Sequence, residues 1–224
     1  YTLNDVSQGG LALPDVSSNM KLLFGQLRFE YTHEHYYKLI NGRKRYFKSD
    51  YPTVFAVYKH AFPLYDQGWA DYSLLYGGLH QEVEAGLLSK FNYHIEGGAF
   101  LASDETHFSD YYHFKTSPLM FDMIGFRNTF LLLDHYRGST NDYFLQAHGE
   151  LNSTFLLLKM LPWFSERLWK ESLSFAYLKT PQVNHHMQFG YSLEEIGFLF
   201  DVGVFTAFEN WKYHGTGLRF YLRF

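Results

Sequence analysis

Hydrophobic and polar side chains alternate with period two along most of this chain. Successive side chains of a β-strand point to opposite faces, so this alternation predicts strands with one apolar and one polar face. Between residues 88 and 101, for example, Phe91 and Ile95 share one face while Asn92 and Glu96 share the other. Nine segments follow the pattern, at residues 21–31, 52–62, 71–84, 88–101, 142–151, 172–177, 186–194, 201–209 and 216–224.

The last segment divides its two faces most clearly. Its apolar row is Leu218, Phe220, Leu222 and Phe224, and its polar row is Gly217, Arg219, Tyr221 and Arg223. In a strand that crosses a bilayer, the apolar row meets lipid, the polar row lines a wet interior, and an aromatic ring sits at the interface. A C-terminal strand ending in Phe also resembles the signal that outer-membrane barrels present to their insertion machinery. Gly217, Leu218, Phe220, Leu222 and Phe224 are therefore the predicted barrel insertion signal.

Composition supports a membrane protein built from strands and excludes one built from helices. The longest apolar runs are short, such as residues 155–158, whereas a spanning helix needs about 20 apolar residues. Aromatic residues make up 21% of the chain and include 19 Tyr, whose hydroxyl groups find partners or water in an interfacial girdle. The sequence thus predicts an all-β fold, namely a transmembrane antiparallel outer-membrane β-barrel.

The connections divide the chain into a short connector and a barrel. Residues 1–20 are rich in Gly, Ser, Asn and Asp without periodicity, which indicates a loop or connector ahead of the barrel portion at 21–224. Residues 102–141 alternate poorly and are too long for a tight turn, so we expect a loop that is extracellular or folded into the lumen. Bacterial single-chain barrels have even strand numbers, so nine strands predict the C-terminal portion of a larger barrel.

A hairpin with a basic cluster is predicted between the first two long strands. Asn41-Gly42 is a strong signal for a two-residue hairpin turn. The cluster around it consists of Lys38, Arg43, Lys44, Arg45 and Lys48. Two interpretations stay open: a solvated turn, or a segment that binds acidic lipid headgroups.

Three stretches carry a family resemblance. They read SDYPTVFAVYKHAF at 49–62, DYSLLYGGLHQEVEAGLLSKFNYHIEGGAFL at 71–101 and STNDYFLQAHGELNSTFLLLKMLPWF at 139–164. From residue 21 onward the chain resembles a large family of outer-membrane barrels from Bacteroidota. Members of that family typically carry an N-terminal carboxypeptidase-regulatory-like domain ahead of the barrel. The resemblance implies a location in the bacterial outer membrane.

That family is in turn distantly similar to the outer-membrane insertase and translocase barrels. Those barrels keep an Arg-Gly motif on a loop inside the lumen, where the Arg meets an acidic inner wall. The corresponding place here is Lys115-Thr116, with Arg137-Gly138 as a second candidate. Lysine keeps the charge but lacks the planar fork of arginine. Lys115 and Arg137 are therefore the lumen-loop candidates.

The predicted polar faces carry charged residues of both signs. Glu96, Glu150, Glu194, Arg219 and Arg223 all fall on the lumen wall, where cross-strand ion pairs would fill or polarise the interior. His33 and His35 share a strand face, but no HExxH and no Cys-based spacing is present, so we expect no metal site and no cofactor. The chain also lacks a GxSxG elbow, and we expect no catalytic residues.

Three functions are compatible with these features. The first is a non-enzymatic component of a complex that assembles, translocates or scaffolds outer-membrane proteins, with lipid and protein partners. The second is a porin or channel for small solutes. The third, a soluble β-sandwich, fits the large outward-facing apolar rows less well. Nucleic-acid binding is not expected, because the net charge is -4 and no basic stripe is present.

Overall fold

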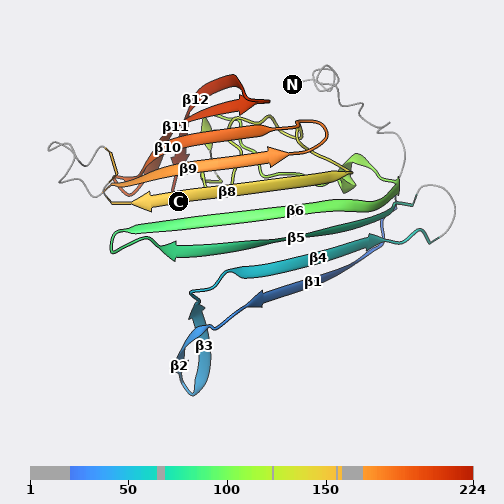
Figure 1. Ribbon diagram of the computed structural model, residues 1–224, viewed down its shortest axis with the longest axis horizontal. Coiled ribbons are helices and arrows are strands. Elements are labelled where there is room, and N and C mark those ends of the chain that lie inside the picture. The colour runs from blue at the N-terminus through green and yellow to red at the C-terminus, as the bar shows by residue number, and fades with distance from the viewer. Residues whose placement is uncertain (1–20, 65–68, 123, 155, 158–168, 224) are drawn as a thin grey trace.

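The computed structural model describes residues 21–64, 69–122, 124–154, 156–157 and 169–223, so the predicted connector 1–20 and Phe224 lie outside the described residues. The fold is all-β, as predicted (Figure 1). The nine long strands are β1 (Phe24–Thr32), β4 (Thr53–Ala61), β5 (Asp71–Glu84), β6 (Ser89–Glu105), β8 (Tyr143–Ser153), β9 (Lys170–Lys179), β10 (His186–Ile196), β11 (Phe200–Glu209) and β12 (Lys212–Leu222). Each corresponds to one of the nine predicted segments. No helix among the described residues is long and apolar enough to cross a membrane.

The long strands form one antiparallel sheet in the order β1-β4-β5-β6-β8-β9-β10-β11-β12. Each strand therefore pairs with its neighbour in the chain once the short elements are set aside, which is an up-and-down topology. The register keeps the predicted apolar rows on one face, because Phe175 pairs with Phe189 and Val204 pairs with Leu218. We call this the outer face. Its side chains stay exposed, for example Phe29 at 80% and Phe189 at 49%.

The opposite, inner face is covered by the long connection between β6 and β8. We call residues 106–142 the inner loop. It contains a 3-10 turn, η1 (Phe108–Asp110), and the two-residue strand β7 (Phe121–Asp122). Figure 1 shows this segment on one side of the sheet, behind β8 to β12. The sequence predicts a loop that is extracellular or folded into the lumen, and in the structure the loop lies against the inner face of the open sheet.

The nine strands, which the sequence predicts to be the C-terminal portion of a larger barrel, do not close into a barrel among the described residues. β1 and β12 lie toward opposite ends of the sheet order and do not pair with each other. The second edge of β12 is instead occupied by β7, where Phe121 and Asp122 pair in parallel with Phe220 and Tyr221. The architecture is therefore an open sheet, and closure would need strands or movements beyond these contacts.

Aromatic packing on the inner face depends on small residues in neighbouring strands. Phe205 breaks the alternation expected for β11, and its ring is only 1% exposed. It lies above Gly190, where an added Cβ would come within 2.2 Å of the Phe205 ring and 2.5 Å of Ser174 Oγ. The glycine therefore provides the space that this inward-pointing aromatic ring needs.

The predicted Asn-Gly hairpin is confirmed. β2 (Tyr36–Ile40) and β3 (Arg43–Lys48) form a separate two-stranded sheet, with Ile40 paired to Arg43 across the turn. Asn41 and Gly42 have φ values of 53° and 75°. Positive φ at both central residues is the requirement of a type I′ turn, which Asn-Gly meets at low cost.

We predict that Gly190→Ala destabilises the fold by about 1–3 kcal/mol, because the new methyl group would overpack against the Phe205 ring. Urea or guanidinium unfolding would measure the change. Gly215→Ala is the matched control, since a Cβ added at that position would have nothing within 4 Å. Equal stability of both variants would show that Phe205 does not depend on Gly190.

Candidate functional site

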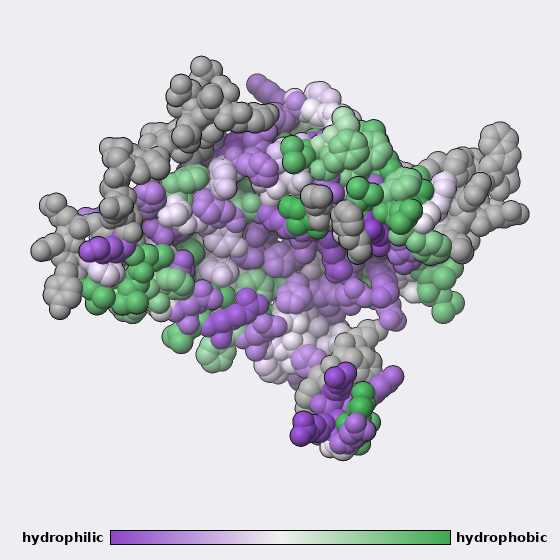
Figure 2. All heavy atoms as spheres, turned by 180° about the vertical axis from the view of Figure 1, so that it is seen from behind, coloured by the Kyte–Doolittle hydropathy of each residue, from purple (hydrophilic) through white to green (hydrophobic). Residues whose placement is uncertain are grey.

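Hydrophilic residues gather on the side of the sheet that carries the inner loop (Figure 2). Two strands hold the main chain of this loop at one point. The backbone N–H groups of Leu131 and Leu132 donate to Gln188 Oε1 at 2.8 and 2.9 Å. Arg219 Nε and Nη2 donate to the Leu131 carbonyl oxygen at 3.1 and 2.7 Å. We call this set of four hydrogen bonds the Leu131 clasp.

The clasp is buried and is surrounded by apolar contacts. Leu131 and Phe130 are fully buried, and Gln188 is 3% exposed. The Phe130 ring packs against His148 with centroids 4.6 Å apart, and it belongs to a cluster with Leu133 and Leu178. Hydrogen bonds to a charged donor contribute about 1.5–3 kcal/mol each, and burial removes the competition from water. The clasp therefore fixes the loop firmly against the inner face.

A second attachment joins the loop to the far end of β11. Arg137 Nη2 lies 2.7 Å from Glu209 Oε2. His186 and His214 each approach Glu209 with a nitrogen–oxygen distance of 3.7 Å. Arg137, the second lumen-loop candidate of the sequence, thus meets an acidic residue of the inner face.

Lys115, the first lumen-loop candidate, does not meet the acidic wall. Its Nζ donates to the backbone carbonyl oxygen of Arg127 at 3.2 Å, within the inner loop itself. Burial lowers the pKa of Lys115, and the nearby carboxylate of Asp122 opposes that shift. Lys115 therefore stabilises the loop internally.

Arg127 reaches the acidic wall in its place. Its guanidinium lies 3.7 Å from a carboxylate oxygen of Glu150 on β8 and 3.9 Å from one of Glu82 on β5. The loop thus carries two arginines toward the inner face, Arg127 toward one end of the strands and Arg137 toward the other. Sequence reasoning missed Arg127 and Gln188. Arg127 stands in a segment without periodicity, and Gln188 looks like any other polar position of an alternating strand.

Glu96 anchors the start of the loop. The Tyr112 hydroxyl donates to Glu96 Oε1, and Glu96 Oε2 lies 3.0 Å from His94 Nε2. The Tyr112 ring also stacks on Phe144 with centroids 3.9 Å apart. Burial and the adjacent Glu96 carboxylate raise the pKa of Tyr112. Tyr112 therefore keeps its proton and stays a donor to the wall.

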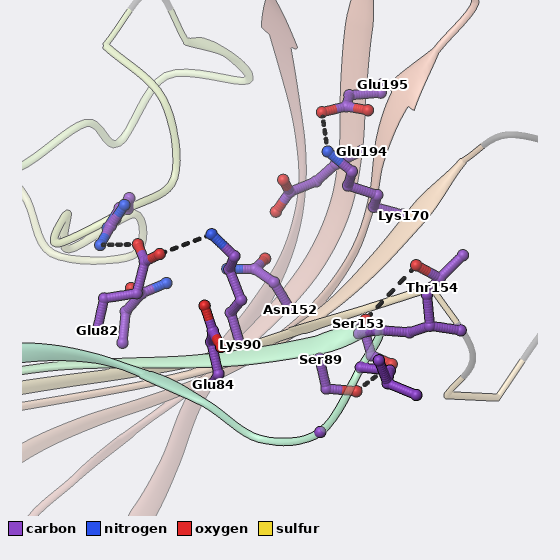
Figure 3. Close-up of a pocket in the computed structure, with 15 residues that line it drawn as sticks. Glu82, Glu84, Ser89, Lys90, Asn152, Ser153, Thr154, Lys170, Glu194 and Glu195 are labelled. Atoms are coloured by element: carbon purple, nitrogen blue, oxygen red, sulfur yellow. Dashed lines mark hydrogen bonds and ion pairs between the residues drawn. The ribbon is translucent and has the colours of Figure 1, made fainter. Parts of the chain in front are cut away.

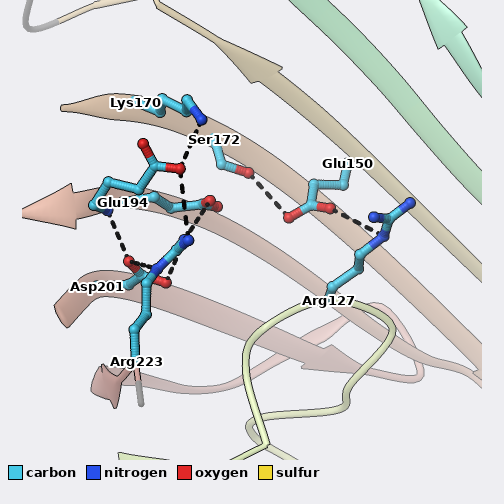
Figure 4. A network of polar contacts seen from close by, with 8 residues as sticks. Arg127, Glu150, Lys170, Ser172, Glu194, Asp201 and Arg223 are labelled. Atoms are coloured by element: carbon cyan, nitrogen blue, oxygen red, sulfur yellow. Dashed lines mark hydrogen bonds and ion pairs between the residues drawn. The ribbon is translucent and has the colours of Figure 1, made fainter. Parts of the chain in front are cut away.

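Arg223 organises a charged cluster at the end of the sheet where β12 finishes (Figure 4). Its Nε and Nη2 donate to the two Asp201 oxygens at 2.8 and 2.9 Å, a bidentate pair. Nη2 also lies 3.2 Å from Glu194 Oε2, while Lys170 Nζ lies 2.6 Å from Glu195 Oε1. The cluster joins β9, β10, β11 and β12 through paired charges. Glu150 lies close by, between Arg127 and Ser172.

A polar cavity opens beside this cluster (Figure 3). Its volume is about 820 Å³. Charged side chains of both signs line it, among them Glu82, Glu84, Lys90, Arg127, Lys170, Glu194 and Glu195. The Lys90–Glu82 pair at 2.7 Å and the Lys170–Glu195 pair balance much of this charge locally. Asn92 is 6% exposed, and its Oδ1 has no hydrogen-bond partner within the described residues.

The polar cavity, with its charged lining, has the size and character to hold a polar chain or solute. Among the described residues, no three His, Asp or Glu side chains lie close enough together to hold a metal ion. Six of the charged side chains that line the cavity take part in ion pairs that tie the loop to the strands or the strands to one another, namely Glu82, Lys90, Arg127, Lys170, Glu194 and Glu195.

The residues of the predicted insertion signal lie on both faces of β12. Leu218 and Leu222 are on the outer face, 41% and 47% exposed, and Phe220 stacks on Phe121 of β7 with centroids 5.5 Å apart. Gly217 lies on the inner face, where a Cβ would come within 2.7 Å of the Arg219 guanidinium.

Comparison with known proteins gives a family but no function. No curated protein and no solved structure matches the chain. One family model does, and it is described as the C-terminal domain of a family of unknown function, DUF5686, with residues 1–193 matched. Because this match covers most of the 224 residues, the chain belongs to the DUF5686 C-terminal domain family.

Proposed function

We propose that this chain is part of an outer-membrane β-barrel that acts as a non-enzymatic component of an assembly, translocation or scaffold complex. The observation that carries the proposal is the division of the sheet into an exposed apolar outer face and a polar, loop-covered inner face. A soluble sheet buries its apolar face in a core and leaves its polar face in water. This sheet does the reverse, which is the arrangement of a strand wall between lipid and lumen.

The exposed apolar surface runs across the whole width of the sheet. Phe29 on β1, Phe189 on β10 and Leu222 on β12 are exposed at 80%, 49% and 47%. An apolar area that extends over nine strands is far larger than the patches that soluble monomers leave exposed. Lipid would cover it along its full width.

The inner loop favours a role in assembly or translocation over that of an open pore. The Leu131 clasp, the Arg137–Glu209 pair and the Tyr112–Glu96 hydrogen bond attach the loop along the length of the inner face. A loop attached in this way occupies the space that a wide channel needs. An arginine of an inward loop against an acidic wall also fits the distant similarity to outer-membrane insertase and translocase barrels that the sequence suggests.

The second candidate function is a small-solute porin or channel. It is favoured by the cavity of about 820 Å³ next to Arg127 and the Arg223 cluster, because paired charges of both signs are typical of a wet lumen. The two functions differ in what they require of the inner loop. A porin passes solute while the inner loop stays in place. An assembly component with this loop conducts only when the loop is released from the inner face.

We predict that Phe189→Arg destabilises the chain in lipid by about 2–4 kcal/mol, because the charge would lie on the lipid side of a transmembrane strand. Unfolding in lipid vesicles, followed by gel mobility, would measure the loss. Leu87→Arg is the control, since Leu87 is fully exposed in the short turn between β5 and β6. A soluble sheet would tolerate both substitutions equally, and that result would contradict the membrane proposal.

We predict that the tagged chain fractionates with outer membranes and co-purifies with other proteins in mild detergent. Density-gradient fractionation followed by mass spectrometry of the purified material would show this. An unrelated tagged barrel, expressed at the same level, is the control for nonspecific capture. A chain that always purifies alone would count against an assembly or scaffold role.

We predict that the complete barrel containing this chain is electrically quiet in planar bilayers and that its Gln188→Ala, Arg219→Ala double variant conducts. The two substitutions remove the four hydrogen bonds of the Leu131 clasp, so the inner loop loses its central attachment. Arg28→Ala is the matched control, because Arg28 pairs only with the exposed Glu30 on its own strand among the ion pairs of the described residues. Steady conductance of the unmodified barrel would instead favour the porin.

A further inference from the structure

The β2–β3 hairpin stands apart from the rest of the described structure. Among the described strands, β2 and β3 pair only with each other and form no ladder with the main sheet. In Figure 1 the hairpin lies across the direction of the long strands and extends away from the sheet past β1. An isolated two-stranded hairpin is marginally stable in water, so a surface that covers it would stabilise it considerably.

The hairpin combines positive charge with exposed apolar groups. The stretch 36–48 contains five Lys or Arg residues and no Asp or Glu, in a chain whose net charge is -4. Leu39 is 68% exposed and Ile40 is 46% exposed, and they lie at the turn beside Arg43 and Lys44. The Lys44 ammonium group also lies 4.6 Å from the centroid of the Tyr37 ring.

We propose that the β2–β3 hairpin binds the anionic lipid surface at one side of the membrane. This inference rests on the proposed membrane location of the sheet. If the long strands cross a bilayer, a hairpin that follows the end of β1 and lies across the strand direction lies along the membrane surface. Cationic side chains gain about 1 kcal/mol each near an anionic surface, and tyrosines and short apolar groups favour the headgroup boundary.

The strand ends next to the hairpin carry exposed aromatic side chains, which fits a position at the membrane surface. Tyr31, at the end of β1, is 63% exposed, and Tyr51, just before β4, is 45% exposed. The His33 ring bridges toward them, with an edge-on contact to Tyr51 at a centroid distance of 4.8 Å. The aromatic groups therefore continue from the outer face of β1 to the base of the hairpin. Their position is that of an aromatic girdle between the apolar wall and the headgroups.

Charge complementarity selects the lipid surface over an acidic protein. The cations and the apolar residues lie together on one short two-stranded element. A flat anionic surface with an apolar layer beneath it receives both kinds of side chain at once, because long cationic side chains reach the headgroups while their stems and the apolar residues lie lower.

A fluorescent label on the hairpin would test the proposal, and the chain contains no Cys that would interfere. Leu39→Cys would carry an environment-sensitive dye in the full chain, reconstituted into phosphatidylcholine vesicles with increasing fractions of phosphatidylglycerol. We expect the dye to enter a less polar environment as phosphatidylglycerol increases, and to return to water in high salt. Lys44→Gln with Arg45→Gln should raise the phosphatidylglycerol fraction needed, with affinity weakened on the order of tenfold.

Two controls separate this inference from the proposed function. A dye at Leu145→Cys, on the outer face of β8, reports membrane insertion and should be in an apolar environment in all vesicles. Lys212→Gln removes a cation from the start of β12, at the opposite end of the strands, and should leave the Leu39 response unchanged.

The other possible results of the dye measurements would refute either the membrane location or the hairpin proposal. A Leu145 dye in water would refute the membrane location and the hairpin proposal with it. An inserted chain whose Leu39 dye ignores phosphatidylglycerol, or whose response survives the loss of Lys44 and Arg45, would refute the hairpin proposal alone. A response that appears only when a co-purified protein is added would assign the hairpin to a protein partner instead of lipid.

Discussion

The arrangement of the inner face depends on the hydrogen bonds of the Leu131 clasp. They attach the inner loop to strands that are distant from it in the sequence. Gln188 accepts from the N–H groups of Leu131 and Leu132, and Arg219 donates to the Leu131 carbonyl oxygen. These bonds come from β10 and β12, while the loop itself connects β6 to β8. Buried backbone N–H and C=O groups need hydrogen-bond partners, and these two strands provide them for the loop. The loop can therefore stay buried against the inner face as part of the interior.

Around the clasp, charge is distributed so that ionic groups of opposite sign meet along the inner face. Arg137 meets Glu209 toward one end of the strands, and Arg223 meets Asp201 toward the other. Arg127 lies between Glu150 and Glu82, next to the polar cavity. Such pairing satisfies the charges of the inner face beside its small apolar clusters, while the large apolar rows of the strands face outward.

The β12 strand contacts the inner loop in two ways, through a side chain on the inner face and through its backbone at the edge of the sheet. Arg219 points inward to the clasp, while the backbone of the same strand pairs with β7 of the inner loop. The loop thus fills the inner face and covers the sheet edge at once. Any strand that pairs with this edge of β12 would have to displace Phe121 and Asp122, and such a displacement would also disturb the loop beside Arg219.

Local periodicity determined the nine strands, their two faces and the Asn-Gly hairpin, because each depends on neighbours within a few residues. It also predicted a shared polar face for Glu96, Glu150, Glu194, Arg219 and Arg223. The path of the inner loop was decided only by tertiary structure. Residues 106–142 have no period, so nothing local indicates that Arg127 and not Lys115 approaches the acidic wall, or that Gln188 binds Leu131 across 57 positions. The open edges likewise depend on pairing between strands distant in sequence.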